Sequence, residues 1–475
     1  MLKKQLWIGG EWVPSREYAV VKSPYSLEPV AEVAQAGEEE TEAAIAAAQR
    51  AFGEMAAMPA HERGAILERV AGLMAARKEE LAGLLVREAA KPLKTARGEI
   101  DRTIQTYKFA AQEARRIHGE TVPLDAAPGG EGRVAFTVRK PLGVVAAITP
   151  FNFPFNLVAH KVGPAIAAGN TVVLKPAGQT PLSALAVAEL FREAGLPAGA
   201  LNVVPGQGAV VGERLVRDPR VKAVSFTGSP EVGIALRSKA GLKRVTLELG
   251  SNSALIIDDT APLTDELIAR CVQGAFGFSG QVCISIQRIY VHESKYEDFL
   301  NKFTRAAGKL VVGDPADERT DLSALIHPKE VQRMERWVAS AKARGASVAL
   351  GGHAVSDTVY APTVLTGVPK DEAVSCREVF GPIVCVAPFA TLEEAIANVN
   401  DSRYGLQAGI YTQNLSAAMK AADRIEAGGV MINDFPTFRV DHMPYGGVKE
   451  SGIGREGVRY AIEELTELKL IAIKL

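Results

Sequence analysis

The chain has 475 residues, of which 47% are hydrophobic and 23% are charged, and its formal net charge is −1. This composition is typical of a globular protein, and the balanced charge argues against a nucleic-acid or anionic-lipid partner. The length exceeds what one hydrophobic core usually supports, so we expect at least two domains, and no long uncharged apolar run predicts a membrane span.

Amphipathic helices are predicted first, over about residues 39–118, where apolar residues recur at helical spacing. The pattern then changes to short β-rich runs that alternate with helical segments. These runs occupy residues 143–149, 171–175, 200–204, 222–226 and 244–249. Such alternation predicts βαβ units and a mostly parallel sheet with helices on both faces.

A second alternating series follows and predicts another α/β unit. Its strands are expected at residues 285–292, 383–389, 407–412 and 429–434, and its helices at 263–279, 294–310, 329–344, 391–400 and 415–425. Residues 134–140 and the last eight residues fit neither series, because apolar and polar residues alternate there. Half-exposed strands of this kind are candidates for pairing between subunits.

Several residues that can carry chemistry follow the strands of the first series, where open α/β sheets bind ligands. Lys175 ends one strand, Glu248 ends another, and Asn152 lies between two prolines in TPFNFP. Each has a structural alternative: a lysine can extend its charge into solvent, a carboxylate can cap a turn, and an amide can brace one.

Two glycine-containing turns are candidates for phosphate binding. PGQGAVVG places Gly206, Gly208 and Gly212 at the start of a helix, which is close to GxGxxG but is equally consistent with a tight βα turn. FTGSPEVG places Gly228 and Ser229 just before a helix, where free amides and a hydroxyl favour a pyrophosphate.

Cys283 is one of four cysteines and lies in FGFSGQVCISIQR, at a glycine-flanked turn. A cysteine is usually a small core residue, but at such a turn it is a candidate nucleophile. The four cysteines lack the close spacing of a disulfide framework or a metal site, so we expect free thiols, no metal, and a cytoplasmic location.

Together, ITPFNFP, VVLKPA, FTGS, LELG, FGFSGQVCISIQR, EVFGP and MPYGGVKESGIGREG resemble the aldehyde dehydrogenase superfamily from about residue 5 to the end. The resemblance implies a Rossmann-like cofactor domain over residues 1–122 and 142–251 and an α/β catalytic domain over 252–450. It also implies a small β oligomerisation arm from residues 123–141 and 451–475.

The resemblance implies specific catalytic roles. Cys283 matches the nucleophile, Asn152 the oxyanion-binding amide, and Glu248 the general base. Lys161 and Glu456 match a proton-relay pair found in some members.

The resemblance also implies NAD or NADP as the cofactor. The residues expected to bind it are Thr149, Pro150, Phe151, Lys175, Ala177, Gly178, Gly208, Gly212, Phe226, Thr227, Gly228, Ser229, Leu249, Gly250, Glu378 and Phe380.

Two positions depart from the family pattern. Gly178 stands where many NAD-preferring members have a glutamate that would repel the 2′-phosphate of NADP, so we expect that NADP can be accepted. Ser251 replaces the second glycine of LELGG, and it would add strain if its φ were positive.

The substrate-binding residues are expected to be Asn156, His160, Arg439 and Tyr445. A cation and an imidazole in place of aromatic walls predict a short polar or anionic aldehyde, as in lactaldehyde, non-phosphorylating glyceraldehyde-phosphate and semialdehyde branches. The alternative is that Arg439 pairs with Asp434 or Asp441 and never meets substrate.

We therefore predict a hydrolytic, NAD(P)-dependent aldehyde dehydrogenase that forms a homodimer or homotetramer. A CoA-acylating enzyme is one alternative, although such members usually lack the glutamate present here as Glu248. A non-catalytic dinucleotide-binding or structural protein is the other, and the retained Cys283, Glu248 and Asn152 argue against it.

Overall fold

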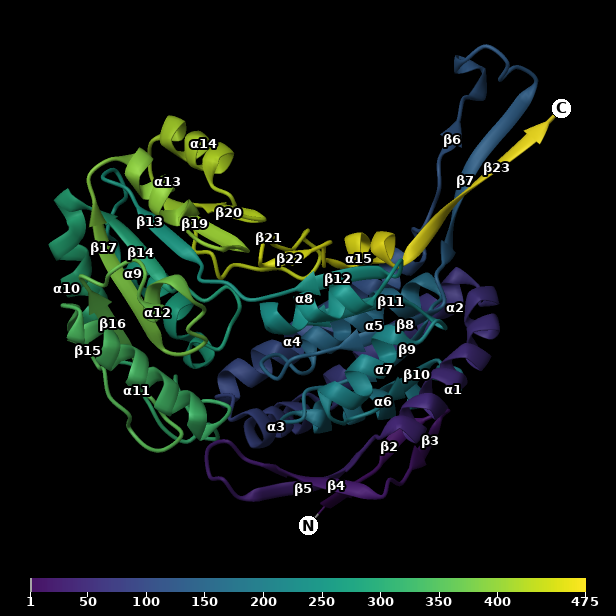
Figure 1. Cartoon of the computed structure of the whole chain (residues 1–475), viewed down its shortest axis with the longest axis horizontal. Helices are drawn as coiled ribbons and strands as arrows, with labels where there is room; N and C mark the ends of the chain where they lie inside the picture. The colour runs from purple at the N-terminus through teal and green to yellow at the C-terminus, as the bar shows by residue number, and fades with distance from the viewer. Residues whose placement is uncertain (1) are drawn as a thin grey trace.

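Two twisted sheets organise the computed structural model, which describes residues 2–475 (Figure 1). The first has eight strands in the order β22-β12-β11-β8-β9-β10-β2-β3, and its five central strands are parallel. These strands are β2 (Leu6–Ile8), β3 (Glu11–Val13), β8 (Val144–Ile148), β9 (Thr171–Lys175), β10 (Leu201–Val203), β11 (Val221–Thr227), β12 (Arg244–Glu248) and β22 (Gly452–Ile453). The predicted parallel sheet is confirmed.

Helices cover both faces of this sheet, so its strands are apolar throughout. Val145 and Ala147 of β8 join one core cluster, whereas Val144, Ala146 and Ile148 join the other. The first cluster includes residues of α2 (Ala60–Ala76), α3 (Lys78–Ala89), α4 (Leu93–Ala114), α5 (Asn156–Ala168), α6 (Pro181–Glu193) and α15 (Val458–Glu464). The second includes residues of α1 (Glu38–Ala57), α7 (Glu213–Arg217) and α8 (Pro230–Lys239).

The second sheet has seven strands in the order β15-β16-β17-β14-β13-β19-β20, all parallel except β15. They are β13 (Ala254–Ile257), β14 (Arg288–His292), β15 (Ser347–Leu350), β16 (Thr363–Thr366), β17 (Ile383–Phe389), β19 (Gln407–Tyr411) and β20 (Gly429–Ile432). Its helices are α9 (Asp265–Phe276), α10 (Tyr296–Ala307), α11 (Pro328–Ala343), α13 (Leu392–Asn400) and α14 (Leu415–Arg424). The predicted second α/β unit is confirmed, although β13, β15 and β16 were not expected.

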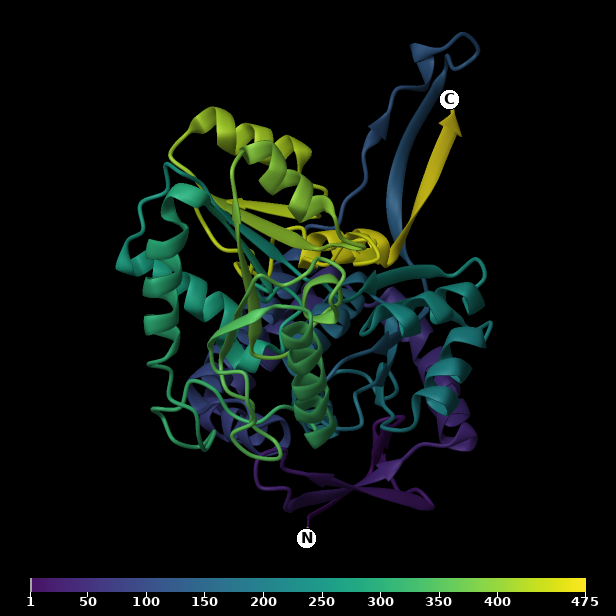
Figure 2. The same ribbon diagram turned by 60° about the vertical axis from the view of Figure 1, so that its left-hand side comes forward.

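A long β arm projects from the body beside the C-terminal strand (Figures 1 and 2). Strand β23 (Thr466–Lys474) pairs antiparallel with β7 (Arg133–Pro141), which also pairs with β6 (Thr121–Val122). Residues 134–140 and the last eight residues, which fitted neither predicted series of strands and helices, thus pair with each other within one chain. Strand β22 and helix α15 belong instead to the first sheet and its helical layer.

The remaining elements are short or lie at the edge of the body. An unexpected three-stranded sheet near the N-terminus consists of β1 (Leu2–Lys4), β5 (Pro29–Gln35) and β4 (Glu17–Lys22). The other short elements are helix α12 (Ala373–Cys376) and the paired strands β18 (Tyr404–Gly405) and β21 (Val448–Lys449). Four short helical turns complete the elements of residues 2–475: η1 (Leu124–Ala126), η2 (Gly208–Gly212), η3 (Gly277–Gly280) and η4 (Glu293–Lys295). No helix among residues 2–475 is both long and apolar enough to cross a bilayer.

Candidate active site

Cys283 lies in an irregular loop between α9 and β14. The predicted helix over 263–279 ends early, at Phe276, and the predicted strand from 285 begins at Arg288. Phe278, Ser279 and Gly280 follow with φ of 48°, 53° and 71°. A side chain at position 280 could not fit, because its Cβ would lie 2.1 Å from the carbonyl oxygen of Gly381. The loop is therefore held in a left-handed path that brings Cys283 to the wall of a cavity.

The Cys283 thiol is half-buried and meets one side chain. Its Sγ lies 3.0 Å from Oη of Tyr445. Burial raises the pKa of the Cys283 thiol to about 11, while the Tyr445 hydrogen bond and the Arg439 charge oppose that rise. All four cysteines are free, and the pKa values of Cys271 and Cys385 are also raised by burial. Cys283 is the one on the cavity wall.

Glu248 is the last residue of β12 and is almost fully buried. Neither carboxylate oxygen has a hydrogen-bond partner. Burial, together with the nearby charge of Glu456, raises its pKa well above the usual range. A buried carboxyl with no partner and a raised pKa is suited to general-base work at neutral pH, rather than to capping a turn.

Asn152 follows β8 and is buried beside the cysteine loop. Its Nδ2 donates to the carbonyl oxygen of Gln281 at 3.0 Å, and its Oδ1 has no partner. The amide therefore reaches the loop two residues before Cys283. A side-chain amide beside the loop of a nucleophilic cysteine is a group of the kind that can donate to an oxyanion.

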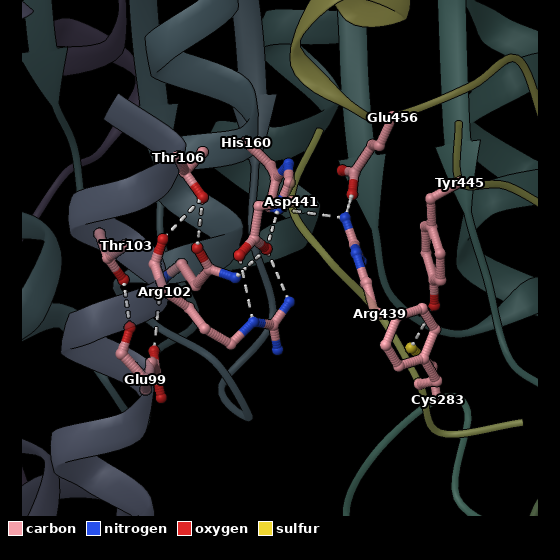
Figure 3. Close-up of polar contacts among 12 residues, drawn as sticks. Glu99, Arg102, Thr103, Thr106, His160, Cys283, Arg439, Asp441, Tyr445 and Glu456 are labelled. Carbon is pink, nitrogen blue, oxygen red and sulfur yellow. Dashed lines mark hydrogen bonds and ion pairs between the residues drawn. The ribbon is translucent and has the colours of Figure 1, made fainter. Parts of the chain in front are cut away.

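Lys161 and Glu456 lie together, at 3.0 Å between Nζ and Oε1. Lys161 also donates to Oγ of Ser225 at 3.2 Å. Arg439 donates from Nη2 to Oε2 of Glu456 at 3.0 Å (Figure 3). Burial opposes ionisation of Glu456, but these cations prevail and lower its pKa to about 2. Glu456 is thus held as an anion between two cations.

A cavity of about 840 Å³ leads to Cys283. Its wall includes the predicted substrate residues Asn156, Arg439 and Tyr445, and also Arg102 of α4. His160 is fully buried behind this wall and is absent from the lining. The structure therefore brings three of the four predicted substrate residues to the cavity, and places the fourth beneath Arg439.

Asp441 connects His160 to the cavity wall. Its Oδ1 accepts from His160 Nε2 at 2.9 Å and from Asn156 Nδ2 at 3.0 Å, and Arg102 binds both of its oxygens (Figure 3). The alternative, in which Arg439 pairs with Asp434 or Asp441, is not found in the structure. Asp441 is occupied by Arg102 and His160, Asp434 pairs with Arg270, and Arg439 pairs with Glu456.

Arg102 and the role of Asp441 were missed by sequence reasoning. Arg102 is one of several charged residues in α4, and helical spacing alone does not distinguish it from a solvated arginine. Asp441 had been considered only as a partner for Arg439. Their meeting depends on the packing of α4 against a loop that follows the second sheet.

The predicted cofactor residues gather mainly at the carboxyl ends of β8, β9, β11 and β12, with Glu378 and Phe380 facing them from the second domain. Burial lowers the pKa of Lys175, and its Nζ donates a hydrogen bond to the backbone carbonyl of Pro176 at 3.2 Å.

The turns beside these strand ends are open. No atom lies within 4 Å of the position that a Cβ would take on Gly178 or Gly208. Ser229 caps α8 by accepting from the amide of Val232. An open glycine-lined edge with a lysine and a helix N-terminus fits a dinucleotide.

The other side of the cofactor region comes from the second domain. Glu378 accepts from the amide of Ser251 at 2.9 Å, and burial raises the pKa of Glu378 to about 7. The Phe380 ring meets Phe151 edge to face, at 5.7 Å between ring centroids. Ser251 is absent from the residues with positive φ, so the expected strain does not arise.

The other predicted cofactor residues lie in the same turns. Gly250 is close to Glu378, since a Cβ there would lie 2.6 Å from Oε2, and the buried Oγ1 of Thr227 has no partner. The rest lie beside these residues in the chain: Thr149, Pro150, Ala177, Gly212, Phe226, Gly228 and Leu249. An unpaired hydroxyl at this edge is a further group that a ligand can satisfy.

Comparison with known proteins agrees with this arrangement. The model of the aldehyde dehydrogenase family matches residues 12–471. A 3-sulfolactaldehyde dehydrogenase of Priestia aryabhattai is 50% identical, with 99% of this chain and 98% of that protein covered. A lactaldehyde dehydrogenase of Methanococcus aeolicus is 38% identical over 98% of this chain and 99% of that protein.

Solved structures give the same result. Aldehyde dehydrogenase 21 of Physcomitrella patens, in complex with the reaction product succinate, is 40% identical with a TM-score of 0.97, covering 100% of this chain and 98% of that one. Glyceraldehyde-3-phosphate dehydrogenase of Methanocaldococcus jannaschii, complexed with NADP, is 39% identical with a TM-score of 0.93, covering 97% and 100%. The chain belongs to the aldehyde dehydrogenase family and is an NAD(P)-dependent aldehyde dehydrogenase.

Proposed function

We propose that the protein oxidises a short aldehyde carrying an anionic group to the corresponding carboxylate, with NAD or NADP. The observation that carries the substrate class is Arg439 on the cavity wall. Its guanidinium donates to Glu456 from Nη2, which also lies 3.2 Å from His160 Nε2, and its buried Nε has no acceptor. A guanidinium with unused donors favours an anion, because arginine binds planar oxyanions through two donors.

The position of Arg439 would bring the anionic group of the substrate close to its aldehyde carbon, which must lie at Cys283. Its guanidinium lies 3.6 Å over the Tyr445 ring, and Oη of Tyr445 contacts Sγ of Cys283 (Figure 3). Each cation on the cavity wall has a carboxylate partner: Arg102 pairs with Asp441, Lys94 with Asp321 and Arg439 with Glu456. Among these cations of residues 2–475, Arg439 is the one that contacts Tyr445, and through it the nucleophile.

The relatives support the same substrate class. The names of those described above refer to 3-sulfolactaldehyde and lactaldehyde, and another relative that is 44% identical is named aspartate-semialdehyde dehydrogenase. These aldehydes are short and polar, and two of them are charged.

In the proposed reaction, the Cys283 thiolate adds to the carbonyl carbon of the aldehyde, and the carbonyl oxygen becomes an oxyanion. Nδ2 of Asn152 and the backbone N–H of Cys283 stabilise this oxyanion, an effect of about 3–4 kcal/mol per donor in comparable enzymes. NAD or NADP would supply the hydride acceptor, and the residues that would hold it are Lys175, Ser229, Glu378 and Phe380. Loss of the hydride leaves a thioester on Cys283.

Hydrolysis then restores the enzyme. Glu248 accepts a proton from water as the water attacks the thioester carbon, and the Cys283 thiolate departs to leave the carboxylate product. Lys161 and Glu456 would return this proton toward solvent. Burial raises the pKa of the Cys283 thiol to about 11 although Tyr445 and Arg439 both lower it, so these two groups reduce the cost of forming the thiolate.

The test compares 3-sulfolactaldehyde with lactaldehyde, which lacks the anionic group. Replacing Arg439 by leucine should lower kcat/KM for the anionic aldehyde by about 10- to 150-fold, the equivalent of about 1.5–3 kcal/mol for a charge-assisted hydrogen bond. The uncharged aldehyde should lose far less. Arg270→Leu is the matched control, because Arg270 also pairs with a carboxylate but lies outside the cavity lining. Equal losses for both aldehydes in Arg439→Leu would refute the anionic substrate.

We further propose a homodimer or homotetramer in the cytoplasm. The arm supports an oligomer, since Leu468, Leu470 and Ile473 of β23 are about half exposed. The four free cysteines support a reducing compartment. Light scattering of the purified protein tests the oligomer, and a monomer at micromolar concentration would refute it.

A further inference from the structure

A buried ion pair lies beneath the loop that carries Asn152. Lys91 follows α3, and its side chain is fully buried with that of Glu99 from α4. The two are in direct contact through Nζ and Oε2. Burying two charges costs several kcal/mol per ion, so a fully buried pair is rarely explained by stability alone.

Each member of the pair binds one end of the Asn152 loop. Lys91 donates from Nζ to the backbone carbonyl of Asn152 at 2.6 Å. Oε1 of Glu99 accepts from the amides of Phe155 at 2.9 Å and Asn156 at 3.2 Å, at the start of α5. The pair therefore fixes the backbone on both sides of the turn from which the Asn152 amide extends.

The Lys91 ammonium also faces the cysteine loop. It lies 3.9 Å from the ring centroid of Phe153 and 4.3 Å from that of Phe278. Phe278 belongs to the left-handed segment before Cys283. One ammonium thus contacts the loop of the oxyanion donor and the loop of the nucleophile, and cation–π contacts gain strength when they are desolvated.

We propose that Lys91 and Glu99 are positioning residues that set the distance between the Asn152 amide and Cys283. They act through the backbone, and the role rests on the proposed function of Asn152 as the oxyanion donor. Misplacement of a donor by about 1 Å can reduce a rate by about 100-fold. The pair should therefore affect kcat, because the oxyanion exists only after the thiolate has added.

The experiment is a double-mutant cycle between Lys91→Met and Asn152→Ala. Lys91→Met should lower kcat about 10- to 100-fold in the wild-type background, with KM for aldehyde and coenzyme changed less than about 3-fold. In the Asn152→Ala background the same substitution should lower kcat less than about 3-fold, because the donor it positions is gone. Lys78→Met is the matched control, since Lys78 pairs with Asp101 at the surface.

Equal losses of kcat in the two backgrounds would overturn the proposal, and so would an unchanged kcat in Lys91→Met. An Asn152→Ala enzyme with full kcat would instead refute the oxyanion role of Asn152, so the two failures are distinguishable. If Lys91→Met alone does not fold, because Glu99 is left as an unpaired charge, the neutral pair Lys91→Met with Glu99→Gln takes its place in both backgrounds.

Discussion

Replacing Glu248 by glutamine separates the two halves of the proposed reaction. The amide has the size of the carboxyl group but cannot accept a proton from water. Because neither oxygen of Glu248 has a partner, the substitution breaks no hydrogen bond in the free enzyme. We therefore expect the free energy of unfolding to change by less than about 1 kcal/mol.

The kinetic effect should be large and confined to hydrolysis. A general base contributes about 10²- to 10⁴-fold, so thioester hydrolysis should slow by this factor while the first oxidation proceeds. Stopped-flow absorbance should show a burst of reduced coenzyme equimolar with enzyme, followed by a slow steady rate. Glu450→Gln serves as the control, because Glu450 pairs with Arg403 at the surface.

The pH dependence gives the same variant a second test. Glu248 must be ionised to accept a proton, and burial raises its pKa well above the usual range for a glutamate. Hydrolysis by the wild-type enzyme should therefore decline as pH falls through that raised pKa, and Glu248→Gln should lose this limb. A wild-type steady rate in the variant would refute Glu248 as the base, and a slow first turnover without a burst would place its role before hydrolysis.

Two further predictions concern the coenzyme and the nucleophile. Gly178→Glu should lower kcat/KM for NADP more than for NAD, because the open space at Gly178 admits a carboxylate that repels the 2′-phosphate. Gly178→Gln controls for size, and an unchanged ratio of kcat/KM between the two coenzymes would contradict the placement of the 2′-phosphate near Gly178. Tyr445→Phe should raise the Cys283 pKa further above about 11, so inactivation by iodoacetamide should slow by about 5-fold at neutral pH, the equivalent of about 1 kcal/mol. That inactivation should quicken as pH rises toward the pKa in either enzyme, and a faster rate in Tyr445→Phe would contradict the role of the hydroxyl.

Patterns of short range predicted much of the fold. The central strands of the first sheet are buried on both faces and read as continuous apolar runs, so β8, β9 and β11 lie within a residue or two of their expected places. Strands β15 and β16 were missed because they are short and lie at one edge of the second sheet. The N-terminal sheet was missed because its central strand β5 pairs with β1, which lies far from it in the sequence, and local patterns do not record such a pairing.

The positions of Glu248, Asn152 and Cys283 were predictable, because a motif places each of them at a strand end or in a fixed turn. The partners of Arg439 were not predictable, since His160 reaches it from α5 and Glu456 from the segment between β22 and α15. The importance of Lys91, Glu99 and Arg102 depends on burial, which the helical pattern of α3 and α4 does not reveal.

The antiparallel strand β22 has a consequence for how the chain folds as it is synthesised. It pairs with the carboxyl end of β12, at Leu247 and Glu248, yet it is translated only after the entire second sheet. At about 5–20 residues per second, this end of β12 would stay unpaired on that side for roughly 10–40 s on the ribosome. Glu248 ends that strand, so the segment that carries the base would acquire its final neighbour among the last steps of biogenesis, and a chain interrupted before Gly452 would present an open edge to other nascent chains.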